Sequence, residues 1–165
     1  MNPKIGGAIT AAIGIVILIG FFSNNSGDSP DYKDEIVFQV TLADPEIYEN
    51  GIYKDFFEIK RGDYIIDFVP NGDSPQELTI ILNGKIYPCY DSKCSQEIGS
   101  FVEEFALEGT LHETAFSSHY TWNYKGLKFF LIHENQELEI IIDPHENLLG
   151  SVSVQIKKIP PITEP

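Results

Sequence analysis

An uncharged apolar segment near the amino terminus is the feature that most constrains this chain. Residues 5–22 contain no charged side chain over 18 positions. A helix of that length spans roughly 27 Å at about 1.5 Å per residue, which is close to the hydrocarbon thickness of a bilayer. A cleavable signal peptide has a shorter apolar stretch and a small-x-small cleavage site, whereas this segment ends in Gly20-Phe21-Phe22. The sequence therefore predicts one N-terminal transmembrane α-helix within residues 1–22, acting as an uncleaved signal-anchor.

The charges that flank this segment predict its orientation. Lys4 and the terminal amine precede it, whereas residues 23–40 contain one lysine and several carboxylates. Because positive charges stay on the cytoplasmic side, we expect a single-pass protein of the cell membrane with a cytoplasmic amino terminus and the remaining chain outside. Small residues would let another membrane helix approach this one, although such residues are also common in membrane helices in general. They are Gly7, Ala8, Ala11 and Ala12.

Composition divides the chain after this segment. Residues 23–34 are rich in Ser, Asn, Gly, Pro and Asp, which predicts a flexible linker, and Asn24 begins a formal N-glycosylation triplet. Residues 1–30 contain one lysine and one aspartate, so the formal charge of −14 falls entirely on residues 31–165. This acidic part lacks sequence clusters of lysine and arginine, which disfavours nucleic acid and anionic lipid as partners.

From residue 35 onward, apolar residues recur with period two or in short runs bounded by Gly, Pro, Asn and Asp. This pattern is typical of strands. Short strands joined by tight turns indicate an all-β, antiparallel two-layer β-sandwich of jelly-roll or immunoglobulin-like size over residues 35–158, followed by a Pro-rich tail at 159–165. The expected strands lie at 35–42, 54–60, 63–69, 76–83, 101–108, 119–124, 127–132, 136–143 and 148–157.

The predicted strands contain an internal repeat. Residues 76–81 (QELTII) recur as residues 136–141 (QELEII), and the preceding segments 57–66 and 121–130 each place a basic residue and a glycine at a turn. Glycine supplies the positive φ that a tight hairpin needs. Two copies of a three-strand unit would face one another with pseudo-twofold symmetry, and chance similarity between β sequences is the alternative.

One stretch of these strands resembles a known family. The residues that carry the resemblance are Phe57-Glu58-Ile59, then Gly62-Asp63-Tyr64-Ile65-Ile66-Asp67-Phe68, then Asn71. Their order is similar to the aromatic, glycine, tyrosine, aromatic progression of GOLD-type β-sandwiches, as in the emp24 group. The resemblance implies a small, membrane-tethered interaction module. This chain differs in having its predicted anchor at the amino end and its cysteines elsewhere, so no site residue of the family is carried over.

The two cysteines lie on the outward side of the predicted anchor. Cys89 and Cys94 flank a polar, turn-rich segment, and an oxidising compartment favours a disulfide between them. So short a loop would contribute about 2 kcal/mol in the chain-entropy model, so the disulfide would hold a local turn rather than the whole fold. A metal site that adds His112 and His119 is the alternative, but the spacing C-x4-C-x17-H-x6-H is wider than the usual zinc patterns.

The remaining residues predict neither a cofactor nor catalysis. The four histidines form no HxH or HExxH arrangement, and Met1 is the only methionine, which leaves blue copper without its usual ligand set. Asp143 and Glu146 on a predicted turn could hold calcium, although turns favour such residues for backbone reasons alone. The motifs G-x-x-x-x-G-K-[ST], G-x-G-x-x-G and G-x-S-x-G are absent from the sequence. We therefore expect a protein that is not an enzyme and has no cofactor.

Three aromatic residues alternate on one predicted strand. Tyr120, Trp122 and Tyr124 share one face, which either belongs to the core or points outward, where it could stack on sugar rings or dock a protein. We predict a non-catalytic accessory subunit of a membrane protein complex, or an envelope interaction module, that binds other membrane or envelope proteins. A glycan-binding module that uses this face is the alternative function, and a domain that binds calcium, zinc or copper is a further one.

Overall fold

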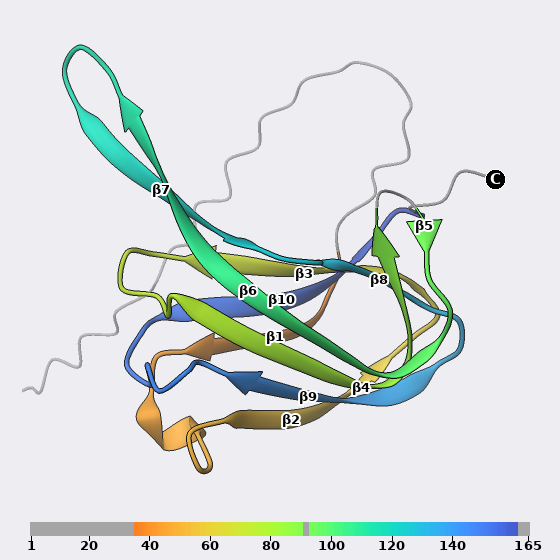
Figure 1. Ribbon diagram of the computed structural model, residues 1–165. Coiled ribbons are helices and arrows are strands. Elements are labelled where there is room, and N and C mark those ends of the chain that lie inside the picture. Colours follow the sequence, from red (N-terminus) through yellow and green to blue (C-terminus); the bar gives the residue numbers. More distant parts are fainter. Residues whose placement is uncertain (1–34, 91–92, 162–165) are drawn as a thin grey trace, which may run out of the picture. The chain divides into compact units, whose positions relative to one another are not determined.

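The computed structural model describes residues 35–90 and 93–161 of the chain (Figure 1). Regular structure in these ranges is strand apart from one turn of 3-10 helix, and the strand pairings are antiparallel, which confirms the all-β, antiparallel prediction. Within them no helix has the length and apolar character to cross a bilayer. The predicted membrane segment and linker, residues 1–34, lie outside the described residues. The elements are β1 (Glu35–Leu42), η1 (Pro45–Ile47), β2 (Tyr53–Ile59), β3 (Gly62–Pro70), β4 (Glu77–Tyr90), β5 (Lys93–Cys94), β6 (Ile98–Glu113), β7 (Ser118–Lys125), β8 (Phe129–Ile132), β9 (Gln136–Asp143) and β10 (Val152–Ile159).

The strands form two layers that share β4. The first layer has the order β1-β10-β3-β8-β4, with β5 beside β4, and the second has the order β2-β9-β4-β6-β7. Residues 77–83 of β4 pair with β6 in the second layer, whereas residues 87–89 pair with β8 in the first. The two layers are therefore parts of one sheet that is continuous through β4.

A bulge at Gly84 and Lys85 lets β4 pass from one layer to the other. The register with β6 shifts between Asn83 and Ile86, and Gly84 has a φ of 155°. The side chain of Gln136 satisfies both backbone groups of Lys85, because its Oε1 accepts from the amide and its Nε2 donates to the carbonyl, each at 2.9 Å. A bulge bends a strand and increases its twist, which turns β4 between the layers.

The strand pairing reproduces the internal repeat. Ile81 and its equivalent Ile141 lie directly opposite each other in the second layer, and Ile65 and its equivalent Phe129 do so in the first. Each layer thus has a local twofold centre between equivalent residues. The two glycine turns differ from the expectation of hairpins. β2 pairs with β9 and β7 pairs with β6, so each turn carries the chain from the second layer to the first.

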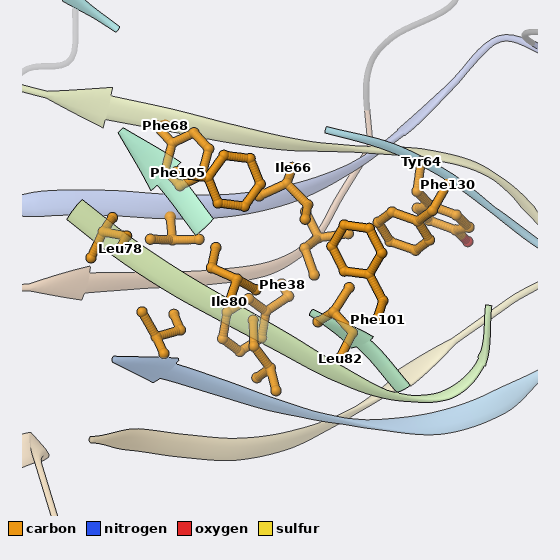
Figure 2. Packing of buried hydrophobic residues seen from close by; sticks show 14 of the residues in the cluster. Phe38, Tyr64, Ile66, Phe68, Leu78, Ile80, Leu82, Phe101, Phe105 and Phe130 are labelled. Carbon is orange, nitrogen blue, oxygen red and sulfur yellow. The ribbon is translucent and has the colours of Figure 1, made fainter. Parts of the chain in front are cut away.

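The inner faces of the two layers enclose one hydrophobic core (Figure 2). Burial alternates along β4 and β9, as expected for strands with one face toward a core. Figure 2 shows Phe68 beside Phe105, and Tyr64 beside Phe130; the ring centroids of these pairs are 4.9 and 5.6 Å apart. The buried residues of β10 are those that the sequence places on one face, Val152, Val154 and Ile156.

Candidate functional site

Strands β6 and β7 continue beyond the other strands as a two-stranded arm (Figure 1). β6 pairs with β4 only as far as Ala106, whereas its pairing with β7 continues to Glu113, opposite Ser118. We call residues 108–123 the arm, and residues 108–121 are all exposed. Because a lone two-stranded ribbon is at best marginally stable in water, its length outside the sheet is not explained by folding stability.

The two faces of the arm differ in chemistry. One face extends the core outward: Leu107 and Tyr124 are buried, Trp122 is half-buried, and Leu111 and Tyr120 are 45% and 56% exposed. The other face carries hydroxyl and imidazole groups, from Thr110, His112, His119 and Thr121. An apolar stripe therefore runs from the core onto an exposed ribbon, which is the kind of surface that marks interaction sites.

The turn at the end of the arm presents Phe116 to solvent. Oγ1 of Thr114 accepts from the amides of Phe116 and Ser117 at 3.4 and 3.0 Å, and the Thr114 amide donates to the Ser117 carbonyl at 2.8 Å. The Phe116 side chain is 100% exposed. Burying such a ring on a partner would contribute about 1.5–3 kcal/mol, so a hydrogen-bonded turn that holds it in water is typical of a contact surface.

Charge is sparse on the arm. Residues 108–123 contain two glutamates and no lysine or arginine, although the whole chain has a formal charge of −14. Serine, threonine and aromatic residues make up half of this segment. Such a mixture supplies rigid aromatic contacts and adaptable hydrogen bonds, as it does in the binding loops of antibodies.

Glycines make room for Trp122 at the base of the arm. Its cross-strand neighbour is Gly109, where an added Cβ would lie 2.7 Å from the indole ring, and Gly72 lies against the same ring. The indole packs on the core cluster and stacks on Tyr120, with ring centroids 5.6 Å apart. This packing ties the arm to the sheet.

Tyr124 fastens the inner end of the arm to the connection before β4. Its hydroxyl donates to the Pro75 carbonyl at 2.5 Å, and its buried ring lies 4.9 Å from that of Phe68, centroid to centroid. Burial raises the pKa of the Tyr124 hydroxyl above its ordinary value.

Tyr53, at the edge of the second layer, also has a raised pKa. Burial is the larger cause and the neighbouring Asp55 the smaller one, and together they raise the pKa of Tyr53 to about 12.

We expect the domain to lose stability as the pH rises above about 10. An unfolded tyrosine releases its proton near that pH, whereas folded Tyr124 keeps its proton, so the stability that the raised pKa contributes is lost as the pH rises toward the folded pKa. Tyr124→Phe should cost about 1 kcal/mol near neutral pH, through the lost hydrogen bond, and should make the alkaline decline shallower. Urea unfolding of both proteins across this pH range measures the two slopes, and equal slopes would contradict the expectation.

The structure divides the predicted aromatic face. Tyr124 belongs to the core, Tyr120 belongs to the exposed arm, and Trp122 lies between them. Leu111 and Phe116 were not predicted as site residues, because each is the one large apolar residue in its stretch of sequence and no alternation marks a strand there. Their only signal in the sequence is that each is a large apolar residue in an otherwise polar segment.

Cys89 and Cys94 form the predicted disulfide. Their sulfur atoms are 2.00 Å apart, and the two residues are cross-strand partners on β4 and β5. Sulfur atoms that are bonded to each other are not available as thiolate ligands, which removes the cysteine part of the alternative metal site.

The other predicted site residues fall in three places. His112 and His119 are cross-strand neighbours on the arm with ring centroids 5.2 Å apart, whereas Asp143 accepts a hydrogen bond from the His145 amide in the turn that holds Glu146. Across residues 35–90 and 93–161, no three His, Cys, Asp or Glu side chains gather so as to hold a metal ion. The predicted helix-interface residues Gly7, Ala8, Ala11 and Ala12 and the glycosylation site Asn24 lie outside the described residues.

No family model, curated protein or solved structure matches this chain. The resemblance to GOLD-type domains stays a prediction.

Proposed function

We propose that this chain is a membrane-anchored, extracytoplasmic β-sandwich that binds another membrane or envelope protein through the arm and has no catalytic role. The apolar segment 5–22 would be the anchor and residues 23–34 the linker. The observation that carries the proposal is the apolar stripe on the arm together with the fully exposed ring of Phe116 in the turn at the end of the arm. The expected contribution to a complex is that of an accessory subunit or interaction module.

A protein partner fits this surface better than a glycan. The indole of Trp122 packs beside Gly109 and Gly72 and stacks on Tyr120, so little of its face is free for a sugar ring. The hydroxyls beside the Phe116 ring, those of Thr114 and Ser117, form hydrogen bonds within the turn, whereas sugar recognition needs free hydrogen-bonding groups beside an aromatic ring. Sparse charge on the arm also indicates that apolar burial, rather than steering by the acidic surface, provides the affinity.

Site-specific photo-cross-linking tests the partner. The full-length chain, carrying the photoreactive analogue p-benzoylphenylalanine in place of Phe116, is irradiated in the cells that make it. We expect one discrete adduct with a second protein, and none when the analogue replaces Phe56, which is 54% exposed on β2. Equal adducts at both positions, or adducts between two copies of this chain alone, would refute the proposal. An adduct sensitive to glycosidases would support the glycan alternative instead.

Phe116→Ser provides the matching loss of function. We expect recovery of the cross-linked partner with the solubilised full-length chain to fall about 10-fold or more, because the ring would be buried only in the complex. The thermal midpoint should not change, since the ring is fully exposed in the free protein. Phe56→Ser is the matched control, and an equal loss in both variants would count against the arm.

The anchor is tested on the same protein. The full-length chain should stay in the membrane pellet after extraction with alkaline carbonate, and protease added outside the cell should digest residues 35–161. Release of the chain by carbonate would refute the predicted membrane helix without bearing on the arm.

A further inference from the structure

Most lysines in the described part of the chain have an acidic or polar partner. Four form ion pairs, and the ammonium of Lys128 donates to Asn123 at 3.0 Å. The ion pairs are Lys54 with Glu139, Lys85 with Glu134, Lys125 with Glu108 and Lys157 with Asp67. In the described ranges the side chains of Lys60, Arg61, Lys93 and Lys158 make no ion pair or hydrogen bond.

Three of these four cations lie at the same end of the first layer. Lys60 and Arg61 occupy the turn between β2 and β3, and Lys158 lies near the end of β10, opposite Tyr64 of β3. Gly62 allows the close approach, because a Cβ there would lie 2.6 Å from Cε of Lys158. Residues almost a hundred positions apart are thus brought together by the pairing of β3 with β10.

Arg61 and Lys158 border a hollow of about 550 Å³. His133 also lines it, with its ring stacked on that of Tyr87 at a centroid distance of 4.0 Å. Asp63 is the one acidic residue in the lining and is only 9% exposed. The rest of the lining is largely apolar and comes from Leu131, Ile132, Ile159 and Pro161, with Gly62 at the turn.

The side chain of Asn135 holds the turn that carries Arg61. The Arg61 amide donates to Oδ1 of Asn135 at 2.9 Å. This bond fixes the backbone at Arg61, and the guanidinium makes no ion pair with the described residues. Arg61 is also the only arginine in the chain. A guanidinium has a planar set of donors that match two oxygens of one anion in parallel, whereas a lysine ammonium lacks this fixed geometry.

We propose that this hollow binds the phosphate group of a small phosphate ester, with Arg61 as the bidentate donor and Lys158 and His133 as the second and third donors. Three donors match the three terminal oxygens of a phosphate ester better than the two oxygens of a carboxylate. The apolar lining would contact the organic part of the ester, for which the volume leaves room. Because the whole domain repels anions, these short contacts rather than the long-range field would hold the ligand.

Binding is measured on the full-length chain in a neutral detergent, through the imidazole NMR signals of its four histidines. Glycerol 3-phosphate is titrated at constant ionic strength, with sodium chloride as the balance. We expect saturable shifts of the His133 signals and no shift for His145, which lies in the turn after β9. Linear, unsaturated shifts of all four histidines would refute the site.

Variants of single cations show which side chains act as donors. Arg61→Gln should weaken binding of glycerol 3-phosphate about 10-fold or more. Arg61→Lys keeps the charge but loses the planar donors, so its affinity should lie between that of Arg61→Gln and that of the natural protein. Lys93→Gln removes a cation elsewhere and is the control; affinities weakened equally by Lys93→Gln and Arg61→Gln would refute the proposal. Circular dichroism verifies the fold, and Lys158→Gln, expected to weaken binding several-fold, replaces Arg61→Gln if that variant does not fold.

A second probe distinguishes the source of the phosphate. If glycerol 3-phosphate and short-chain phosphatidic acid, a lipid that also ends in a phosphate monoester, bind equally, a soluble ester suffices. Tighter binding of phosphatidic acid would identify a lipid headgroup as the ligand, and either result supports the site. The absence of binding by both probes would overturn it. Neither result depends on the arm, so this inference and the proposed function fail separately.

Discussion

Replacing Phe105 with alanine is expected to lower the free energy of unfolding by about 3–5 kcal/mol. Phe105 is fully buried on β6, its ring centroid lies 4.9 Å from that of Phe68, and an added Cβ on Gly126 would lie 2.6 Å from it. Strands of both layers surround the ring and cannot close a cavity of that size. The loss is large against the roughly 5–15 kcal/mol that stabilise a typical domain.

Urea unfolding of the full-length protein, followed by Trp122 fluorescence and by circular dichroism, measures this loss. Phe116→Ala is the matched control, because the same change on a fully exposed ring should alter stability by no more than about 0.5 kcal/mol. Leucine fills more of the space of the phenylalanine ring than alanine does, so Phe105→Leu should lower the free energy of unfolding by less. This variant can be measured if Phe105→Ala does not fold. Similar losses for Phe105→Ala and Phe116→Ala would show that Phe105 is not a core residue.

Gly84→Ala is expected to cost about 2–5 kcal/mol of unfolding free energy. At Gly84 an added Cβ would lie 2.2 Å from Cδ2 of buried Leu138 and 3.0 Å from Oε1 of Gln136, and the φ of 155° is unfavourable for alanine. Moving Gln136 would also break its two hydrogen bonds to the backbone of Lys85. The substitution therefore damages the bulge through which β4 joins the two layers.

Gly99→Ala is the control for this experiment. Gly99 lies on β6 with no atom within 4 Å of an added Cβ, so we expect a change of no more than about 0.5 kcal/mol. Thermal and urea unfolding of both variants give the comparison. Equal stability of Gly84→Ala and the natural protein would mean that β4 does not need this bulge.

Strands that bury one face were predictable from the sequence. The segments 35–42 and 136–143 coincide with β1 and β9 from end to end. Their apolar residues alternate or run together because the core requires a buried side chain at every second position. The disulfide was predictable for a similar local reason, since only five positions separate Cys89 from Cys94.

Strands that lack this pattern were not predictable at their full length. The sequence predicted strands at 76–83 and 101–108, whereas β4 and β6 run to Tyr90 and Glu113. The predicted strands stop just before Gly84 and Gly109. In the structure each glycine lies inside a strand, and a side chain from another strand occupies the position that a Cβ would take. The β7 half of the arm was predicted at 119–124 from its alternating aromatic residues, whereas the β6 half was missed beyond residue 108, because Leu111 is the one large apolar side chain among residues 109–113.

By itself, the sequence determined the extended segments that bury one face, and which of their side chains face inward, because buried and exposed residues alternate along them. Only the tertiary structure decided which strands pair, that the glycine turns cross between layers rather than close hairpins, and that the arm leaves the sheet. It also decided that Arg61 and Lys158 meet at one hollow. These features depend on the register between strands far apart in the chain, which is set by packing that no local pattern contains.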